Sequence, residues 1–208
     1  MDNTISIELA KQIMGCNFIG PNELKSIKEM KFRLPVSIQL IPFDEETLRK
    51  KCKDYFLIYG LSEFEDGRIV NIRNIKSIFG MNTNNHLPCF YFQDWYDKEK
   101  FIDTSMQEGW FLIKKSVYKD SRGVQPETLS EKYIFPKAIT CTYAFFVAWL
   151  VREYKLWYND FVWCSDKDHN GDRIYVGKYH DIDGINHDGF SIHRYLSIRQ
   201  CYACIDWK

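Results

Sequence analysis

The N-terminal part of the chain carries a helix-like spacing of apolar residues, with polar positions between them. Ser6 can cap such a helix and Gly15 can end it. Pro21 suits the first turn of a second short helix. The apolar residues that would share one face of the first helix are Ile7, Ala10, Ile13 and Met14.

Residues 34–60 change pattern twice. "LPVSIQLIP" alternates with a period of two, which predicts a strand with Val36, Ile38 and Leu40 on one face. "FDEETLRKKCKDY" follows as a helix that Asp44 can cap. "YFLIYG" is a continuous apolar run typical of a buried strand. Together these stretches predict a small α/β layer.

The strongest single element is "FPKAITCTYAFFVAWLVREYKLW", in which apolar residues cover nearly every helical face. It predicts a buried helix from Pro136 to about Lys155. "GWFLIKKSV" before it reads as a strand, and "MNTNNHLP" as a loop. The core positions expected on the helix are Tyr143, Phe146, Val147 and Leu150.

From Phe161 onward the period becomes two, and "FVWCS", "RIYVGKY" and "SIRQCYACI" all predict strands. No tandem repeat or low-complexity linker interrupts the chain. The patterns therefore predict a single compact α+β domain over residues 1–208. Its N-terminal α/β portion would cover residues 1–130, and its buried helix and C-terminal strands residues 131–208.

Composition narrows the classes of function. The chain has 28 basic and 28 acidic residues, so its formal net charge is zero. This balance disfavours a nucleic-acid binder that relies on an excess of basic residues. No signal-like start and no apolar run of 18 residues occur, so we expect neither secretion nor membrane insertion. The seven scattered cysteines fit reduced thiols in the cytoplasm. No motif indicates a cofactor.

"WCSDKDHNGDRIYVG" resembles the first half of a calcium-binding EF-hand loop, with alternate oxygens at Asp166, Asp168, Asn170 and Asp172. The twelfth position, which should supply a bidentate Glu, is Gly177. The alternative is a β-hairpin tip, in which Asn170-Gly171 would supply the positive φ angles of a two-residue turn. We expect the hairpin tip and no high-affinity calcium site.

Two other patterns are weaker indications of a metal site or a catalytic site. Cys201 and Cys204 form one C-x-x-C pair, but structural zinc usually needs two such pairs, so we expect buried thiols. "HDIDGINHDG" contains two His-Asp pairs, but adjacent residues of an extended chain face opposite ways. No nucleophile elbow, P-loop or dinucleotide fingerprint occurs. We expect no catalytic residues and no resident metal.

Residues 179–199 have an unusual composition. They contain no Lys, Glu, Gln, Met or Trp, although these types make up 48 of the 208 residues and about five would be expected. The mixture of Asp, His, Asn, Tyr, Ser and Gly is typical of binding loops. We expect an exposed binding surface formed by Tyr179, His180, Asp181, Asn186, His187, Asp188, His193 and Tyr195.

Several motifs resemble known families. "AKQIMGCNFIGPNEL", "FQDWY", "GWFLIKK" and "WCSDKDHNGDRIYVG" occur in an order that resembles an uncharacterised family of bacterial proteins. In that family a similar aspartate-rich segment precedes a variable tail. The resemblance would cover most of the chain, and it implies no known activity.

The C-terminal half is similar to C-type-lectin-like domains, in the branch of formylglycine-generating-enzyme-like proteins and retroelement variable proteins. The similarity rests on Trp163 to Ser165, Tyr175 to Gly177 and Ser197 to Arg199. It implies three strands that frame a ligand face. In the variable proteins, adenine-directed mutation of asparagine-type codons cannot reach the five residue types missing from residues 179–199.

These observations favour a cytoplasmic, non-enzymatic module whose polar C-terminal loops bind a protein or a small molecule. One alternative is a metal-dependent hydrolase that uses the Asp- and His-rich loops. Another is a phage-associated structural protein, which would share the fold but lack the exposed ligand face.

Overall fold

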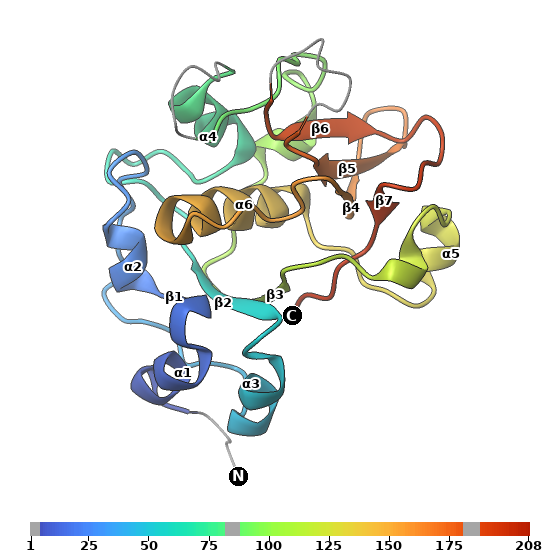
Figure 1. Ribbon diagram of the computed structural model, residues 1–208. Helices are drawn as coiled ribbons and strands as arrows, with labels where there is room; N and C mark the ends of the chain where they lie inside the picture. The colour runs from blue at the N-terminus through green and yellow to red at the C-terminus, as the bar shows by residue number, and fades with distance from the viewer. Residues whose placement is uncertain (1–4, 82–87, 181–187) are drawn as a thin grey trace.

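The computed structural model describes residues 5–81, 88–180 and 188–208. The predicted loop "MNTNNHLP" falls mostly outside these residues. A central helix, two sheets and several peripheral helices make up the fold, and Figure 1 shows how they are arranged.

The central helix is α6 (Ala138–Arg152), which lies between the two sheets (Figure 1). Every residue from Ala138 to Ala148 is buried, so the predicted buried helix is confirmed. Pro136 lies just outside it, because Lys137 is the N-cap. Three expected core residues, Tyr143, Phe146 and Val147, are buried, whereas Leu150 in the last turn is only partly buried.

The first sheet has the order β1-β2-β3. β1 (Phe18–Ile19) runs parallel to β2 (Tyr55–Gly60), and β3 (Gly109–Lys114) runs antiparallel to β2 over its full length. All of β2 is buried, which confirms the prediction for "YFLIYG". The Tyr143 hydroxyl on α6 donates a 3.0 Å hydrogen bond to the Tyr59 carbonyl, so α6 is bonded to this sheet.

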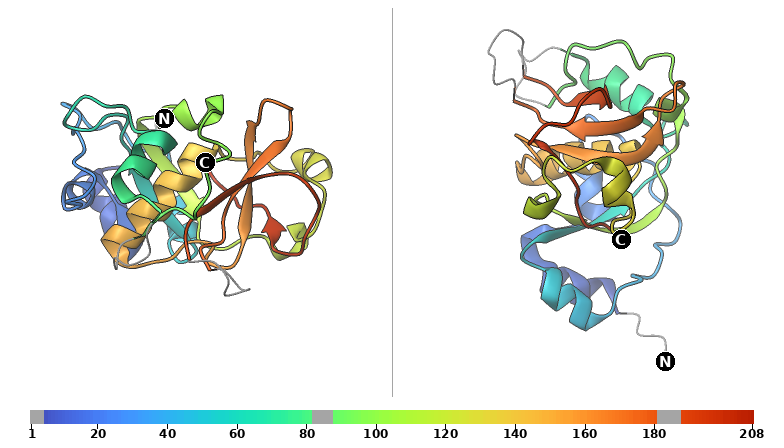
Figure 2. Two further views of the ribbon diagram at one scale, coloured as in Figure 1. Left: turned by 90° about the horizontal axis from the view of Figure 1, so that it is seen from above. Right: turned by 90° about the vertical axis from the view of Figure 1, so that its right-hand side faces the viewer.

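Short helices cover the other side of the first sheet. α1 (Ile7–Met14) and α3 (Glu45–Lys51) pack together on the side away from α6 (Figures 1 and 2). The Ser6 and Asp44 side chains accept the N–H groups of Leu9 and Thr47, as the capping patterns predict. α2 (Pro21–Lys25) begins with Pro21 in its first turn.

The predicted strand at residues 34–42 does not form. Ile41 makes only an isolated antiparallel bridge with Ile5, and the exposed fractions of Val36 and Leu40 are 109% and 72%. The predicted strand-helix-strand unit would pair this segment with β2, but β1 and β3 already flank β2 on both sides. Pro35 and Pro42 also lack N–H groups at the ends of the segment. The predicted strand-helix-strand unit is therefore wrong.

The second sheet has the order β6-β5-β4-β7. β4 (Phe161–Lys167) and β5 (Arg173–Gly177) form the predicted antiparallel hairpin. Of "SIRQCYACI", only β7 (Tyr202–Ala203) is a strand, and it runs parallel to β4. β6 (Ser191–Arg194) lies within the predicted binding loops and instead pairs with β5.

The C-terminal residues join the two halves of the molecule. Leu112 of β3 and Lys208 exchange two backbone hydrogen bonds of 2.9 and 3.0 Å. Asp206 accepts hydrogen bonds from Lys51 at 2.5 Å and from Tyr55 at 2.7 Å. The tail that follows the second sheet therefore extends the edge of the first sheet.

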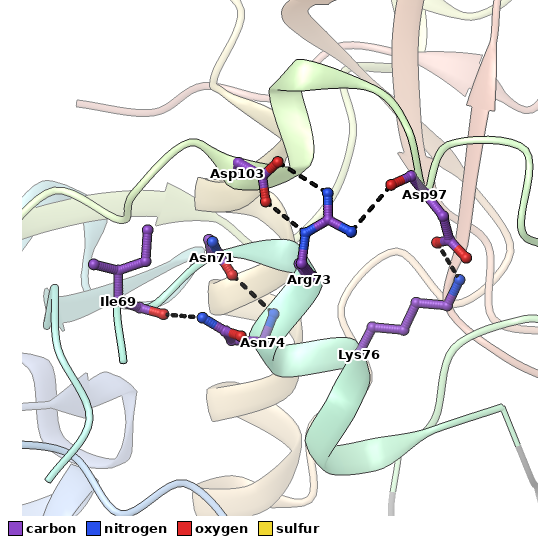
Figure 3. Close-up of polar contacts among 7 residues, drawn as sticks. All are labelled: Ile69, Asn71, Arg73, Asn74, Lys76, Asp97 and Asp103. Atoms are coloured by element: carbon purple, nitrogen blue, oxygen red, sulfur yellow. Dashed lines mark hydrogen bonds and ion pairs between the residues drawn. The ribbon is translucent and has the colours of Figure 1, made fainter. Parts of the chain in front are cut away.

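Helix α4 (Ile72–Phe79) holds the segment that carries part of the candidate site. Arg73 makes a two-pronged ion pair with Asp103, and the Lys76 ammonium lies 2.7 Å from the Asp97 carboxylate (Figure 3). Asn71 caps the helix through the N–H of Asn74. The remaining short elements are α5 (Pro126–Ser130), η1 (Gly15–Asn17), η2 (Lys100–Asp103) and η3 (Lys119–Ser121).

The protein is thus a mixed α+β fold, with one large apolar cluster that includes residues of both sheets and of α6. Within the described part of the chain, no helix combines the length and the apolar character needed to cross a bilayer.

Replacing Phe146 by alanine tests the central position of α6. Phe146 is fully buried and its ring centroid lies 4.8 and 4.9 Å from those of Phe79 and Phe90. We expect Phe146→Ala to lower the free energy of unfolding by about 3 to 5 kcal/mol in urea titrations. Val36→Ala, at a fully exposed position, should change it by less than about 0.5 kcal/mol. Equal effects of the two substitutions would contradict this packing.

Candidate functional site

The β4–β5 hairpin ends in a five-residue loop, residues 168–172, between the paired residues Lys167 and Arg173. The predicted hairpin is confirmed, but the predicted two-residue turn is wrong. Gly171 has a φ of 88°, whereas Asn170 has no positive φ. The Asp168 side chain shapes the loop, because its Oδ1 accepts the N–H groups of Asn170 and Asp172, each at 2.9 Å.

The aspartates of the calcium-like stretch do not share one site. Asp166 Oδ2 accepts the Ala138 N–H at 2.6 Å, which caps the N-terminus of α6. Burial raises the pKa of Asp166, although the Ala138 N–H acts in the opposite direction. Asp168 instead faces its own loop and Arg194, whose Nη1 lies 3.3 Å from Oδ2. Burial acts to raise the pKa of Asp168, but the N–H groups of Asp172 and Asn170 hold it below its usual value.

A histidine and a buried glutamate meet beside this loop. Glu99 is 7% exposed, and its two oxygens accept the His169 N–H at 3.0 Å and contact the His169 Nδ1 at 2.5 Å. With the Nδ1 proton directed at the carboxylate, Nε2 is the ring nitrogen left for other contacts. The His169 side chain is 67% exposed, so that nitrogen is accessible to a ligand.

These groups border a cavity of about 300 Å³, which we call the tip pocket. Three of the residues that line it are lysines. None of these three lysines forms an ion pair with a described residue. α4 fixes one wall through Asp97 and Asp103 (Figure 3). The tip pocket is lined by Lys98, Glu99, Lys100, Lys167, Asp168 and His169.

The tip pocket suits an anion better than a cation. Glu99, Asp168 and His169 bring ligand atoms within 4.8 Å of one another, as a metal site requires. However, each oxygen of the two carboxylates already faces an N–H donor, and one of these donors is the Arg194 guanidinium. Unpaired lysine ammonium groups would also repel a metal ion. No Ser, Thr or Cys nucleophile lines the pocket among the described residues.

The expectation that Tyr179 is exposed is wrong. Tyr179 is 6% exposed, its ring stacks on Phe145 of α6, and its hydroxyl lies 3.4 Å from the Cys89 sulfur. Burial raises its pKa well above the usual value for tyrosine. Its polar sequence neighbours suggested a loop, but the aromatic ring is part of the main core.

The other described residues of the predicted surface are partly buried. His193 on β6 packs against the rings of Phe161 and Tyr175, and His180 pairs with Asp188 at 3.2 Å. The Tyr195 hydroxyl donates to Gln125 at 2.5 Å. The three remaining predicted residues, Asp181, Asn186 and His187, lie outside the described residues.

Three of the predicted residues do line one cavity, of about 110 Å³, which we call the strand pocket. A cavity of roughly 150 Å³ is known to hold one benzene molecule, so the strand pocket fits one chemical group rather than a whole metabolite. Its described lining is Tyr91, Phe161, Lys178, Tyr179, His180, Ser191 and His193.

Sequence reasoning missed the residues of the tip pocket other than Asp168. Glu99 and His169 are 70 residues apart, so no local spacing indicates their pairing. A weak signal was the alternation of charge in "DKEK" next to an aromatic stretch. The C-x-x-C pair behaves as expected in one respect, because Cys204 is buried and burial raises its pKa to about 12.

No protein-family model matches this chain, and no curated protein and no solved structure matches it either. Function is therefore inferred from the chemistry of the described residues.

Asp168→Ala tests whether this carboxylate organises the hairpin tip. Two backbone N–H groups and Arg194 would lose their acceptor, so we expect a loss of about 1 to 3 kcal/mol in the free energy of unfolding. Asp172→Ala, whose side chain makes no hydrogen bond to a described residue, should cost less than about 0.5 kcal/mol. We also expect millimolar calcium to leave the melting temperature unchanged. A rise of several degrees that Asp168→Ala abolishes would instead show a calcium site.

His193 predicts a dependence of stability on pH. Burial lowers its pKa to about 4, and Lys178 and Arg199 act in the same direction, so the folded state holds it neutral. Because the unfolded histidine titrates near 6.5, the stabilisation is complete above that pH and is lost as pH falls toward 4. Between pH 7 and pH 4 the wild type should lose about 3 kcal/mol more than His193→Gln, as measured in urea titrations at each pH. Parallel losses in the two proteins would contradict the assignment.

Proposed function

We propose that the protein is a non-enzymatic binding module that takes a small anionic ligand in the tip pocket. The observation that carries this proposal is the set of three lysines, unpaired among the described residues, around a cavity of about 300 Å³. Small-molecule sites occupy upward of about 300 Å³, so the tip pocket has room for a compact ligand.

The donors favour a phosphate ester or a di- or tricarboxylate. Lys98, Lys100 and Lys167 supply point charges, and His169 presents Nε2 on a ring that Glu99 orients. The Glu99 and Asp168 carboxylates belong to buried residues, each 7% exposed, and are engaged by N–H donors. The cationic groups therefore dominate the field that an entering ligand meets.

The position of the tip pocket also supports a binding role. It lies at one end of the second sheet, at the tip of the β4–β5 hairpin, whereas the strand pocket lies at the other end of β5. The resemblance of this half of the chain to C-type-lectin-like domains would make this sheet and its loops the ligand face. Under the same proposal, the strand pocket with His180, Tyr179 and His193 would receive a single group of a partner.

A metal-dependent hydrolase and a phage-associated structural protein remain alternative proposals with less support. A metal would have to displace the N–H donors on Glu99 and Asp168, as described above. A structural protein would not need three lysines at one cavity that form no ion pair with a described residue.

Isothermal titration calorimetry with pyrophosphate, inorganic phosphate and citrate tests the anion site. We expect at least one of these anions to bind, and the double variant Lys100→Ala, Lys167→Ala to bind it at least about tenfold more weakly. Binding should also weaken with rising salt, because exposed charges are screened.

Lys28→Ala is the matched control, because Lys28 is another exposed lysine that makes no ion pair with a described residue. It should bind like the wild type. The proposal fails if none of the three anions binds at concentrations up to about 1 mM, or if the control weakens binding as much as the double variant.

A further inference from the structure

Glu99 fixes which nitrogen of His169 carries the proton when the ring is neutral. Its Oε1 lies 2.5 Å from the His169 Nδ1, and its Oε2 accepts the His169 backbone N–H at 3.0 Å. A carboxylate accepts hydrogen bonds and donates none, so the proton of the neutral ring belongs on Nδ1. Nε2, on the side of the ring away from Glu99, then carries a lone pair.

This lone pair is the wrong partner for an anion in the tip pocket. The oxygens of phosphates and carboxylates accept hydrogen bonds, and so does the unprotonated Nε2, so the two would face each other without a donor. A second proton on the ring turns Nε2 into an N–H donor and gives the ring a positive charge. A hydrogen bond between two charged groups is about twice as strong as one between neutral groups. The imidazolium form of His169 is therefore the form that is complementary to an anion.

The charged groups around His169 act on its protonation in opposite directions. The Glu99 and Asp168 carboxylates favour the protonated ring. The groups that oppose it are Lys98, Lys100, Lys167 and, on β6, Arg194, which pairs with Asp168. An entering anion adds negative charge to this set, so its binding favours protonation of the ring.

Among these groups, histidine is the residue type that ordinarily changes its charge between pH 6 and pH 8. Lysine and arginine ordinarily titrate above this range, and aspartate and glutamate below it. Although burial acts to raise it, the pKa of Asp168 is held below its usual value by the N–H groups of Asp172 and Asn170, so this carboxylate stays charged. The charge of His169 is therefore the one that pH changes near neutrality.

We propose that the tip pocket binds its anion together with one proton, which passes from the solvent to Nε2 of His169. The proposal rests on the proposed function of the tip pocket and gives that pocket a regulation: the anion is held at pH 6 and released as the pH rises toward 8. Glu99 is the positioning residue, because it fixes the tautomer that makes the second proton necessary.

Titration calorimetry of the whole chain at pH 6 and pH 8 tests this coupling. The probe is whichever of pyrophosphate, inorganic phosphate and citrate binds the wild type most tightly. Between the two pH values, the dissociation constant of the wild type should rise at least about fivefold more than that of His169→Asn. The asparagine can keep an N–H on Glu99 but takes up no proton. Any titration of the anion itself cancels, because both proteins meet the same anion.

Glu99→Gln tests the role of the tautomer. The carbonyl of the glutamine can accept the His169 backbone N–H while its NH2 group donates to Nδ1, which leaves the proton of the neutral ring on Nε2. This variant should therefore bind the anion with less dependence on pH than the wild type. A merely structural role of Glu99 would instead weaken binding equally at both pH values. His180→Asn, at a histidine of the strand pocket, is the control and should keep the pH dependence of the wild type.

Proton uptake can also be measured directly at pH 7, by repeating the calorimetry in Tris and in HEPES, whose ionisation enthalpies differ. The wild type should take up more protons per bound anion than either tip-pocket variant. If an anion binds but the wild type and both variants respond equally to pH, the proton coupling is overturned and the anion site stands. If none of the three anions binds, the anion site itself fails and the coupling fails with it.

Discussion

The structure depends on the need to cover α6 on all sides. Eleven successive residues of this helix, Ala138 to Ala148, are buried, so it has no face that can meet water over that length. One sheet cannot cover such a helix. The first sheet lies on one side, the second sheet and α4 lie on the other, and the large apolar cluster runs through all of them (Figure 1).

The candidate site inherits its geometry from this packing. Asp166 caps the first turn of α6, which places the end of β4 at the helix N-terminus. The hairpin tip then begins two residues later, where Asp168 closes the loop and directs His169 toward Glu99. The ion pairs of α4 with Asp97 and Asp103 hold the segment that carries Glu99 (Figure 3). The tip pocket therefore lies between two segments that the core positions independently.

Local sequence patterns predicted the elements whose burial or capping depends on residues close in sequence. The Ser6 and Asp44 caps, the buried strand β2, the β4–β5 hairpin and α6 all follow from residues close in sequence. Residues 34–42 have an equally clear strand pattern, but the predicted unit would pair them with β2, and nothing local shows that β1 and β3 already flank β2.

At the candidate site, too, local sequence patterns do not show which distant residues come together. Tyr179 has polar neighbours in sequence, yet its ring packs on Phe145 of a distant helix. Glu99 and His169 have no common motif, and only the tertiary structure brings them together. The exposed surface expected at residues 179–195 was inferred from composition, which does not distinguish a loop tip from a half-buried strand such as β6.

The attachment of the C-terminal tail to the first sheet has a consequence for the rate of folding. Lys51 and Asp206 are 155 residues apart in sequence, and Tyr59 and Tyr143 are 84 apart, yet both pairs are bonded. Contacts between such distant residues require large loops to close before any energy is gained from them. Chains rich in these contacts reach the native state slowly, and slow folding prolongs the exposure of apolar segments in partly folded chains. Until both sheets have formed, α6 with its aromatic residues would be the largest exposed apolar segment.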